Sequence, residues 1–582
     1  MKNFLTSCAG TMVGILVLFF LVIVYFVSVV SIETPVVVED NSVLFIKLDK
    51  QITELELEEP LAEILPTADN ESIGLIELRD AIRHAKDDEK IKGIYLNAPA
   101  IGAAFSTLDE IRKAIEDFKA SGKWVISYSD SYTEGGYYVS TAADKVYMNP
   151  TGSVELNGLA IEMQYFKKLF DKLEIKPEVF RVGDFKAAVE PFLRDDMSDE
   201  NRLQLTEMIN GIYGHMTSEL AKSRNLPAER VKEIADKMLV RNSAQAVEFG
   251  LIDSLYYDDQ IKDEIRNKLG LDPKRSIPFV KYSDYRKSFE VQAGTSKNEI
   301  AVIVADGEIV PGRSEASGVV GGATIRDQIR RARTSDRVKA IVIRVNSPGG
   351  AFVAADEMWR EVYLASKEKP VIGSMGDYAA SGGYYLSMAC DTIVAQPNTI
   401  TGSIGVFSVL FDLSDFMGNK LGITSEQVKT GEIGDLVTVT RPLTQQEKDI
   451  WQKQTDEVYE IFTSKAAQGR NMSQDDIKKV ASGRVWTGTQ ALDKGLVDVL
   501  GSFDDAVKIA ADKAGLGDDY KLKFYPKQKS FIERLMKDYE DDVRTSTLKE
   551  AAGEYYNWFR QWERVKEYQG TQARMPFEFI IQ

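Results

Sequence analysis

Cysteine and histidine are nearly absent from this chain of 582 residues, which contains two of each. The cysteines, Cys8 and Cys390, are too few for a disulfide framework. The histidines, His84 and His215, exclude a His-rich metal site and leave only two candidates for a histidine-based triad. We therefore expect no metal and no cofactor, and any hydrolytic chemistry needs a base other than histidine.

Positive charge is also in short supply. Lysine and arginine number 72 against 89 aspartates and glutamates, so the formal net charge is −17. This surplus argues against nucleic acid as a partner, because a phosphate backbone is bound through cationic side chains. The hydrophobic fraction of 44% and the charged fraction of 28% are typical of globular proteins. At about 150 residues per domain, the length allows roughly four domain-sized pieces.

The N-terminal segment has no charged side chain from Asn3 to Ile32, and residues 12–30 are almost continuously apolar. A run of ~20 apolar residues is long enough to cross the hydrocarbon layer of a membrane. We therefore predict one transmembrane helix within residues 1–32, held in membrane lipid through residues 12–30. Lys2 before the run and Glu33 after it favour an N-terminus inside and a body outside. The alternative is a cleaved export signal, which would export the body equally.

The rest of the chain repeats itself. Gly382-Gly383-Tyr384-Tyr385 lies 247 residues after Gly135-Gly136-Tyr137-Tyr138. Other matches keep the same order at nearly the same spacing, such as Gly250-Leu251-Ile252-Asp253 with Gly495-Leu496-Val497-Asp498. Matches that keep order and spacing over ~200 residues indicate an internal duplication.

Each copy alternates short β-branched runs with longer helical patterns, which is typical of α/β domains built from βαβ units. In the second copy we predict the strands Ile300–Val304, Ala340–Val345, Val371–Ser374 and Thr392–Ala395. The predicted helices between them are Ile325–Thr334 and Phe352–Glu368. We expect a first unit over residues 43–281, a second over 299–526, and a helical tail over 527–582 that has no counterpart in the first half.

Two glycine-bearing turns follow predicted strands in the second copy, at Asn346–Gly350 and Ala380–Gly383. Glycine lets the backbone approach a ligand closely, and two N–H donors aimed at one point stabilise an oxyanion. Ser381 stands in the second turn, where a helix begins, and is a candidate nucleophile. Either turn taken alone is more often only a turn, so the pair of turns carries the interpretation.

A serine nucleophile needs a base, and a buried neutral lysine is the substitute when histidine is scarce. Lys186 of the first copy aligns with Gly434 of the second, whereas Ser381 of the second aligns with Glu134 of the first. One copy has the lysine without the serine, and the other has the reverse. A single composite Ser–Lys site explains both differences, although Lys186 alone would more often be a solvated surface lysine.

These motifs resemble signal peptide peptidase A (protease IV) in its long, duplicated, membrane-anchored form. The resemblance extends from the N-terminal segment to about Ser502 and rests on four motifs: Gly183–Ala188, Ser347–Gly350, Ala380–Tyr385 and Thr401–Val406. It implies two tandem crotonase-like domains, related to the Clp protease. It also implies that Ser381 is the nucleophile, Lys186 the general base, Gly350 and Gly382 the oxyanion-hole donors, and Ser403 the residue that orients the lysine.

The resemblance further implies a serine endopeptidase that degrades cleaved signal peptides and other hydrophobic peptides. Its expected place is the bacterial inner membrane, with a single pass and the catalytic body on the periplasmic side. The family's bowl-shaped assemblies imply a homo-oligomer, with a tetramer as one size. The alternatives are a crotonase-like acyl-CoA hydratase or isomerase and a non-catalytic membrane scaffold, neither of which needs a serine and a lysine in complementary halves.

Overall fold

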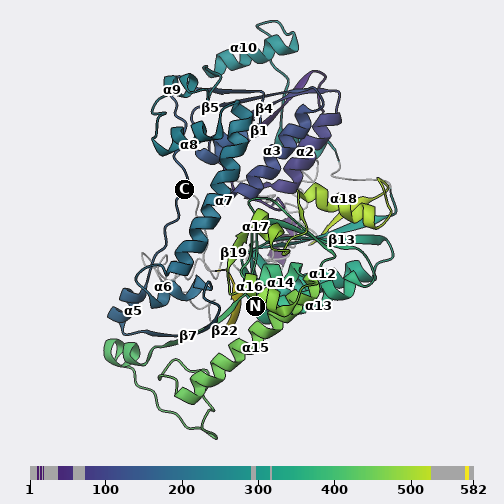
Figure 1. The fold of residues 1–582 in the computed structure, drawn as a ribbon. Coiled ribbons are helices and arrows are strands. Elements are labelled where there is room, and N and C mark those ends of the chain that lie inside the picture. The colour runs from purple at the N-terminus through teal and green to yellow at the C-terminus, as the bar shows by residue number, and fades with distance from the viewer. Residues whose placement is uncertain are drawn as a thin grey trace.

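The computed structural model describes residues 10–11, 14–15, 17–18, 37–56, 72–289, 296–314, 318–525 and 570–575. These residues form two α/β units and a third sheet made of strands from both halves of the chain (Figure 1). Most of the predicted anchor, residues 12–30, lies outside the described residues. No helix in the described ranges is both long and apolar enough to span a bilayer.

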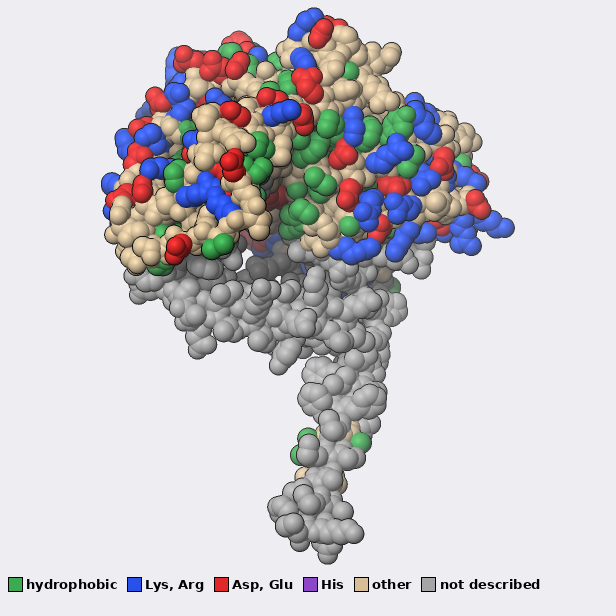
Figure 2. Space-filling model, turned by 90° about the horizontal axis from the view of Figure 1, so that it is seen from below, with side chains coloured by type: hydrophobic (Ala, Val, Ile, Leu, Met, Phe, Trp, Pro, Cys, Tyr) green, Lys and Arg blue, Asp and Glu red, His purple; other side chains and the backbone are tan. Residues whose placement is uncertain are grey.

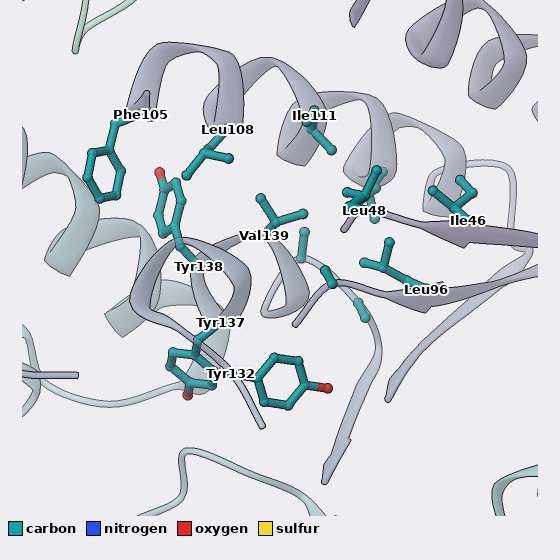
Figure 3. Packing of buried hydrophobic residues seen from close by; sticks show 14 of the residues in the cluster. Ile46, Leu48, Leu96, Phe105, Leu108, Ile111, Tyr132, Tyr137, Tyr138 and Val139 are labelled. Carbon is teal, nitrogen blue, oxygen red and sulfur yellow. The ribbon is translucent and has the colours of Figure 1, made fainter. Parts of the chain in front are cut away.

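The first unit is built on a parallel sheet of six strands in the order β8-β6-β5-β4-β1-β9. Its central strands are almost continuously buried, as expected where helices cover both faces of a sheet. In Figure 3, Leu108 and Ile111 of helix α3 pack with Val139 of helix α4 and Leu96 of β4. The elements are β1 Ser42–Lys47, α2 Leu75–Asp87, β4 Ile91–Asn97, α3 Phe105–Lys119, β5 Trp124–Ser129, α4 Glu134–Ser140, β6 Lys145–Met148, α7 Asp199–Arg224, β8 Ser254–Leu255, α10 Asp258–Leu269 and β9 Phe279–Lys281.

The second unit repeats this order of elements. Its strands β20-β16-β15-β13-β10-β21 are parallel neighbours in the same sequence, which shows the duplication in the topology itself. The elements are β10 Glu299–Asp306, α12 Gly322–Thr334, β13 Val338–Ser347, α13 Phe352–Ser366, β15 Val371–Ala380, α14 Gly382–Ser387, β16 Thr392–Ala395, α15 Gln445–Arg470, β20 Val499–Leu500, α18 Phe503–Lys513 and β21 Lys521–Tyr525.

All four strands predicted for the second unit are present, and Thr392–Ala395 has the predicted bounds. Strand β15 runs beyond the predicted end at Ser374 to Ala380 because it changes partner. Its first half pairs with β16, and its last residues pair with β17, Ile400–Gly402. This extension brings the end of β15 to the start of helix α14.

A third sheet joins distant parts of the chain, in the order β12-β11-β14-β22-β18-β7. Its strands are β7 Lys176–Val182, β11 Glu308–Val310, β12 Val319–Gly321, β14 Gly349–Ala351, β18 Val406–Asp412 and β22 Gly570–Arg574. Strand β7 of the first unit pairs antiparallel with β18 of the second along its whole length. The described part of the predicted helical tail is a strand, because β14 and β18 offer it hydrogen-bonding edges on both sides.

Buried ion pairs connect the two units. Arg344 on β13 donates to Glu54 of the first unit at 2.8 Å, and a second guanidinium nitrogen lies 3.4 Å from a Glu110 carboxylate oxygen. Asp377 on β15 accepts hydrogen bonds from both the backbone nitrogen and the hydroxyl of Thr107, each at 2.8 Å. Breaking the Arg344 ion pairs would leave an uncompensated buried charge, so they and the Thr107 contacts hold the two units together.

Shorter elements complete the described part of the chain. They are β2 Ile52–Thr53, β3 Ile73–Gly74, α5 Lys167–Leu173, α6 Glu190–Leu193, α8 Ala228–Asp236, α9 Ser243–Glu248, α11 Tyr282–Tyr285, α16 Gln474–Val480, β19 Val485–Thr487 and α17 Gly488–Asp493, together with 3-10 turns at Ala187–Val189 and Arg286–Ser288 and a π-helical turn at Phe416–Lys420.

Candidate active site

The pairing of β7 with β18 carries Lys186 out of the first unit and into the second. After Val182 the chain turns at Gly183, which has a φ of 104°. A Cβ atom at Gly183 would lie 2.4 Å from the carbonyl oxygen of Ser482, so only glycine allows this close approach. Phe185 then donates its N–H to the same Ser482 oxygen at 3.0 Å. The loop is docked on the second unit, and Lys186 is fully buried there.

Ser381 stands at the junction of β15 and α14. Its backbone has φ 55° and ψ −110°, a sparsely populated conformation that costs about 1–3 kcal/mol for a residue other than glycine. Two backbone hydrogen bonds hold it, from Ser381 N to the Gly402 carbonyl and from Tyr385 N to the Ser381 carbonyl, both 2.8 Å. The fold thereby directs the Ser381 side chain to one place.

The Lys186 amine and the Ser381 hydroxyl meet at that place. The Nζ–Oγ distance is 2.9 Å, and both residues belong to the same chain. The amine also donates to the carbonyl oxygen of Ser403 at 3.1 Å and to its hydroxyl oxygen at 3.0 Å. The Ser403 hydroxyl in turn donates to the Gly483 carbonyl at 3.3 Å. Ser403 therefore contacts the lysine through two atoms and is itself held in position.

Burial favours the neutral form of this lysine. The three oxygen atoms that the amine contacts belong to hydroxyl and carbonyl groups, so none offers a negative charge to stabilise an ammonium ion. Loss of water around the amine lowers the pKa of Lys186 well below its ordinary value. A neutral amine has a free lone pair and can accept a proton from the adjacent hydroxyl.

Three glycines border the serine on its other side. A Cβ atom at Gly382 would lie 3.2 Å from the backbone nitrogen of Gly350, and one at Gly349 would lie 2.8 Å from that of Gly382. Gly350 has a φ of 150° and leaves no room for a side chain, because a Cβ atom there would lie 2.1 Å from the Ile309 carbonyl oxygen. The backbone nitrogens of Gly350 and Gly382 thus lie in one small region next to Ser381.

The structure brings together all five residues that the sequence singles out for the site: Lys186, Ser381, Ser403, Gly350 and Gly382. A neutral amine, a serine hydroxyl and clustered backbone donors are the groups that acyl transfer from a peptide to serine requires. Among the described residues, no cluster of three or more His, Cys, Asp or Glu side chains could hold a metal ion.

Sequence reasoning missed the residues that wall in the lysine. A Cβ atom at Gly483 would lie 2.6 Å from the Lys186 Cβ, and one at Gly405 would lie 3.3 Å from its Cδ. Gly405 falls within the Thr401–Val406 motif, but that motif gave no sign of its contact with the lysine. Gly483 lies in no motif, so nothing in the sequence indicated its contact with the lysine. Strand β22 also lies in no motif and has no counterpart in the first half, so the sequence did not predict it.

The fold and these groups define a hydrolase that uses a serine. The Peptidase family S49 matches residues 117–272 and 364–517, one match in each unit. The chain belongs to this family and is a serine protease.

Several known proteins are similar to parts of this chain. A relative named Protease 4 from Haemophilus influenzae is 36% identical over 441 residues, which cover 74% of this chain and 71% of the relative. A putative signal peptide peptidase SppA from Enterococcus faecium is 34% identical over 181 residues, 31% of this chain and 52% of the relative. The solved structure of ClpP1 from Listeria monocytogenes matches 35% of this chain and 92% of its own at 17% identity, with a TM-score of 0.23.

Proposed function

We propose that the chain is an endopeptidase with a Ser–Lys dyad, in which Ser381 is the nucleophile and Lys186 the general base. The observation that carries the proposal is the 2.9 Å contact between the Ser381 hydroxyl and a buried amine that has no charged partner among its contacts. A base must lie within hydrogen-bond reach of the proton it removes and must be unprotonated at working pH. Burial lowers the pKa of Lys186, which favours the second condition.

The reaction proceeds in two halves. Lys186 removes the Ser381 proton, the serine oxygen attacks the peptide carbonyl carbon, and the N–H groups of Gly350 and Gly382 stabilise the oxyanion. The protonated lysine then gives its proton to the leaving amine as the C–N bond breaks. In the second half Lys186 takes a proton from water, the hydroxide attacks the ester, and the proton returns to the Ser381 oxygen.

The proposed substrates are cleaved signal peptides and other hydrophobic peptides at the bacterial inner membrane. The apolar run of residues 12–30 supports this, since an anchor there would hold the site beside apolar peptides on the periplasmic side. The Enterococcus faecium relative carries the name of a signal peptide peptidase.

We also propose that the chain works as a homo-oligomer, with a tetramer as the size to be tested. The support is the segment of the second unit between the π-helical turn Phe416–Lys420 and helix α15. It exposes apolar side chains, with Val428 and Val437 at 102% and 74% exposure. Exposed apolar groups gathered in one segment mark contact surfaces. Figure 2 views the molecule from below, the side on which this segment lies in Figure 1, and shows positive and negative side chains interspersed over the described surface.

Substitution of the dyad tests the proposal. We expect Ser381→Ala and Lys186→Met each to lower kcat for a fluorogenic peptide by at least about a thousandfold, because neither attack nor proton removal has a substitute group. Lys176→Met on the exposed part of β7 is the matched control and should keep full activity. Circular dichroism checks that each variant folds. Near-normal hydrolysis by either dyad variant would refute the assignment, and turnover of an acyl-CoA would favour the hydratase alternative.

A further inference from the structure

Strand β15 contains a bulge just before it reaches the candidate nucleophile. On either side of the bulge, the residues that pair along the parallel ladder between β13 and β15 are Val345 with Met375 and Ser347 with Ala379. The single residue Asn346 of β13 therefore lies opposite three residues of β15, 376–378. A bulge bends its strand and redirects the side chains that follow, and bulges are common next to active sites. Here β15 ends at Ala380, and Ser381 comes next.

The Asn346 side chain connects this bulge to the neighbouring strands. Its Oδ1 accepts a hydrogen bond from the Tyr378 backbone nitrogen at 3.1 Å, and its Nδ2 donates to an Asp306 carboxylate oxygen at the end of β10, also at 3.1 Å. The Asn346 carbonyl oxygen accepts from Gly307 N at 2.9 Å. A backbone N–H only donates and a carboxylate only accepts, so a side chain with one acceptor and one donor is needed between them. One amide thus joins the carboxyl ends of β10, β13 and β15, which are neighbours in the sheet.

The first unit holds the same bulge from another direction. Thr107 donates to the Asp377 carboxylate through its backbone nitrogen and its hydroxyl, each at 2.8 Å. The ladder between β13 and β15 is interrupted over the bulge, so the hydrogen bond from Tyr378 to the Asn346 side chain connects the bulge to β13. The bulge is therefore held between the first unit and the Asn346 amide.

All three strands lead into the candidate site. Strand β15 leads to Ser381, and β13 leads into the turn that contains Gly350. Strand β10 leads to Ile309, whose carbonyl oxygen would lie 2.1 Å from a Cβ atom at Gly350, so it packs on the same turn. Attack and oxyanion stabilisation require the serine oxygen and the Gly350 N–H to keep a fixed arrangement. Asn346 joins the strand ends from which both groups extend.

We infer that Asn346 is a positioning residue, whose side-chain amide sets the relative places of Ser381 and the Gly350 N–H by holding the β15 bulge. The inference rests on the proposed function, because it takes Ser381 as the nucleophile and Gly350 as an oxyanion donor. A displacement of about 1 Å at such a site lowers the rate about a hundredfold. Asn346→Ala should therefore lower kcat by about tenfold to a hundredfold and leave KM within about threefold of its original value.

A change of charge at Asn346 tests the amide in the active enzyme. Asn346→Asp puts a second carboxyl group next to Asp306, where Glu54 and Asp377 add negative charge and Arg344 pairs with Glu54. Two carboxyl groups this close share a proton, so the new pair keeps its hydrogen bond at low pH and loses it as the pH rises. Relative to the unmodified chain, we expect kcat to be within about threefold at about pH 6 and about a hundredfold lower at about pH 9.

The double variant Asn346→Asp/Asp306→Asn has the amide and the carboxylate in exchanged places. Its amide at position 306 can donate to the carboxylate at position 346, which can still accept from the Tyr378 nitrogen. We therefore expect kcat within about threefold of the unmodified chain at both pH values. A merely structural role for Asn346 would show neither this rescue nor the pH dependence of the single variant.

Hydrogen–deuterium exchange tests the bulge without any need for catalysis. In the Ser381→Ala chain, we expect Asn346→Ala to speed amide exchange over residues 376–386 at least about tenfold, because the bulge loses its bond to β13. The double variant should exchange at the original rate. The matched control is Asn97→Ala: Asn97 ends β4, the counterpart of β13 in the first unit, and its amide donates to the Tyr128 carbonyl at 2.8 Å. This control should change neither kcat nor the exchange over residues 376–386.

Two outcomes would overturn the inference. One is an Asn346→Ala chain in which either kcat or the exchange over residues 376–386 is unchanged. The other is a double variant that stays as slow as Asn346→Asp at about pH 9. A failure of the Ser–Lys assignment is seen separately, as hydrolysis by the Ser381→Ala or Lys186→Met chain, whereas the exchange rates depend only on the bulge.

Discussion

The environment of Lys186 matches a neutral amine atom by atom. Such an amine has two N–H donors and one lone pair, and around it lie the two oxygens of Ser403 and the hydroxyl of Ser381. The Ser403 oxygens can accept both donors, which leaves the lone pair for the Ser381 proton. A buried amine is hard to protonate, so Ser403 also matters in the proposed reaction, in which the lysine becomes charged.

We predict that Ser403→Ala lowers kcat roughly tenfold to a hundredfold and leaves KM nearly unchanged, because a hydrogen bond to a charged group contributes about 1.5–3 kcal/mol. The alanine keeps the backbone carbonyl that contacts Lys186 but removes the hydroxyl. The pH profile distinguishes an orienting role from a structural one: the hydroxyl accepts from the amine and so favours its charged form, and its loss should shift the acidic limb of the activity profile to lower pH. Ser403→Thr, which keeps the hydroxyl, is the control for this profile. Unchanged kcat in the alanine variant would contradict the prediction.

For individual residues, the sequence was enough to predict that Lys186 and Ser381 meet, because the two halves differ at those positions in complementary ways. It could not show that Gly405 and Gly483 close around the lysine, because contacts of a buried side chain depend on loops far apart in the chain. The strained backbone of Ser381 likewise has no local signature, since hydrogen bonds to Gly402 and Tyr385 impose it.

Among the elements, β7 decides where the lysine goes. It leaves the first unit, pairs along its whole length with β18, and ends one turn before Lys186. Gln204 on helix α7 strengthens the connection, because its amide donates to the Phe185 carbonyl at 3.0 Å and accepts from Val485 N at 3.3 Å. Lys186 is thus positioned from both sides by elements of different units.

We predict that Gly183→Ala lowers kcat about a hundredfold and also lowers the melting temperature, because the Gly183 φ of 104° is strained for alanine. A Cβ atom there would strike the Ser482 carbonyl at 2.4 Å, so the loop must shift, and a displacement of about 1 Å is enough for such a loss. Gly214→Ala on helix α7 is the matched control, because its Cβ atom would meet open space. Steady-state kinetics and thermal melts of both variants measure the effect. Full activity of Gly183→Ala would show that the turn does not set the lysine's position.

Element prediction succeeded where the pattern is local and failed where pairing is distant. The buried strands of the second unit read as continuous apolar runs, so Ile300–Val304 and Ala340–Val345 could be located from sequence. Strand β22 could not, because its five residues, Gly570–Arg574, are mostly polar and become a strand only between β14 and β18. The pairing of β7 with β18 could not be predicted for the same reason, because the two strands lie far apart in the sequence.

At the scale of the whole molecule, the buried carboxyl group of Asp377 near Arg344 makes stability depend on pH. Burial raises the pKa of Asp377 to about 6. The folded chain therefore holds a proton on Asp377 between about pH 4 and pH 6 that the unfolded chain has lost. The stability from this group is present below about pH 4 and is lost as pH rises through about 6.

We predict that Asp377→Asn unfolds at a higher denaturant concentration than the unmodified chain at pH 8. Its free energy of unfolding should be higher by roughly 2–3 kcal/mol there, and this difference should vanish near pH 4. The amide can keep the two contacts with Thr107 without carrying a charge. Asp518→Asn on the exposed surface is the control and should show no such trend. Chemical denaturation across this pH range provides the measurement. A difference that is constant with pH would mean that folding does not raise the pKa of Asp377.

The candidate site takes residues from both units, and this determines when during synthesis the site can form. Lys186 leaves the ribosome early, Ser381 much later, and the Ser482–Gly483 loop that encloses the lysine later still. Domains fold as units in the order of synthesis, so the first unit can be complete while the chain has no means of cutting anything. If the proposed dyad carries the activity, a nascent or truncated chain is inert, and proteolysis begins only when a nearly complete polypeptide has folded.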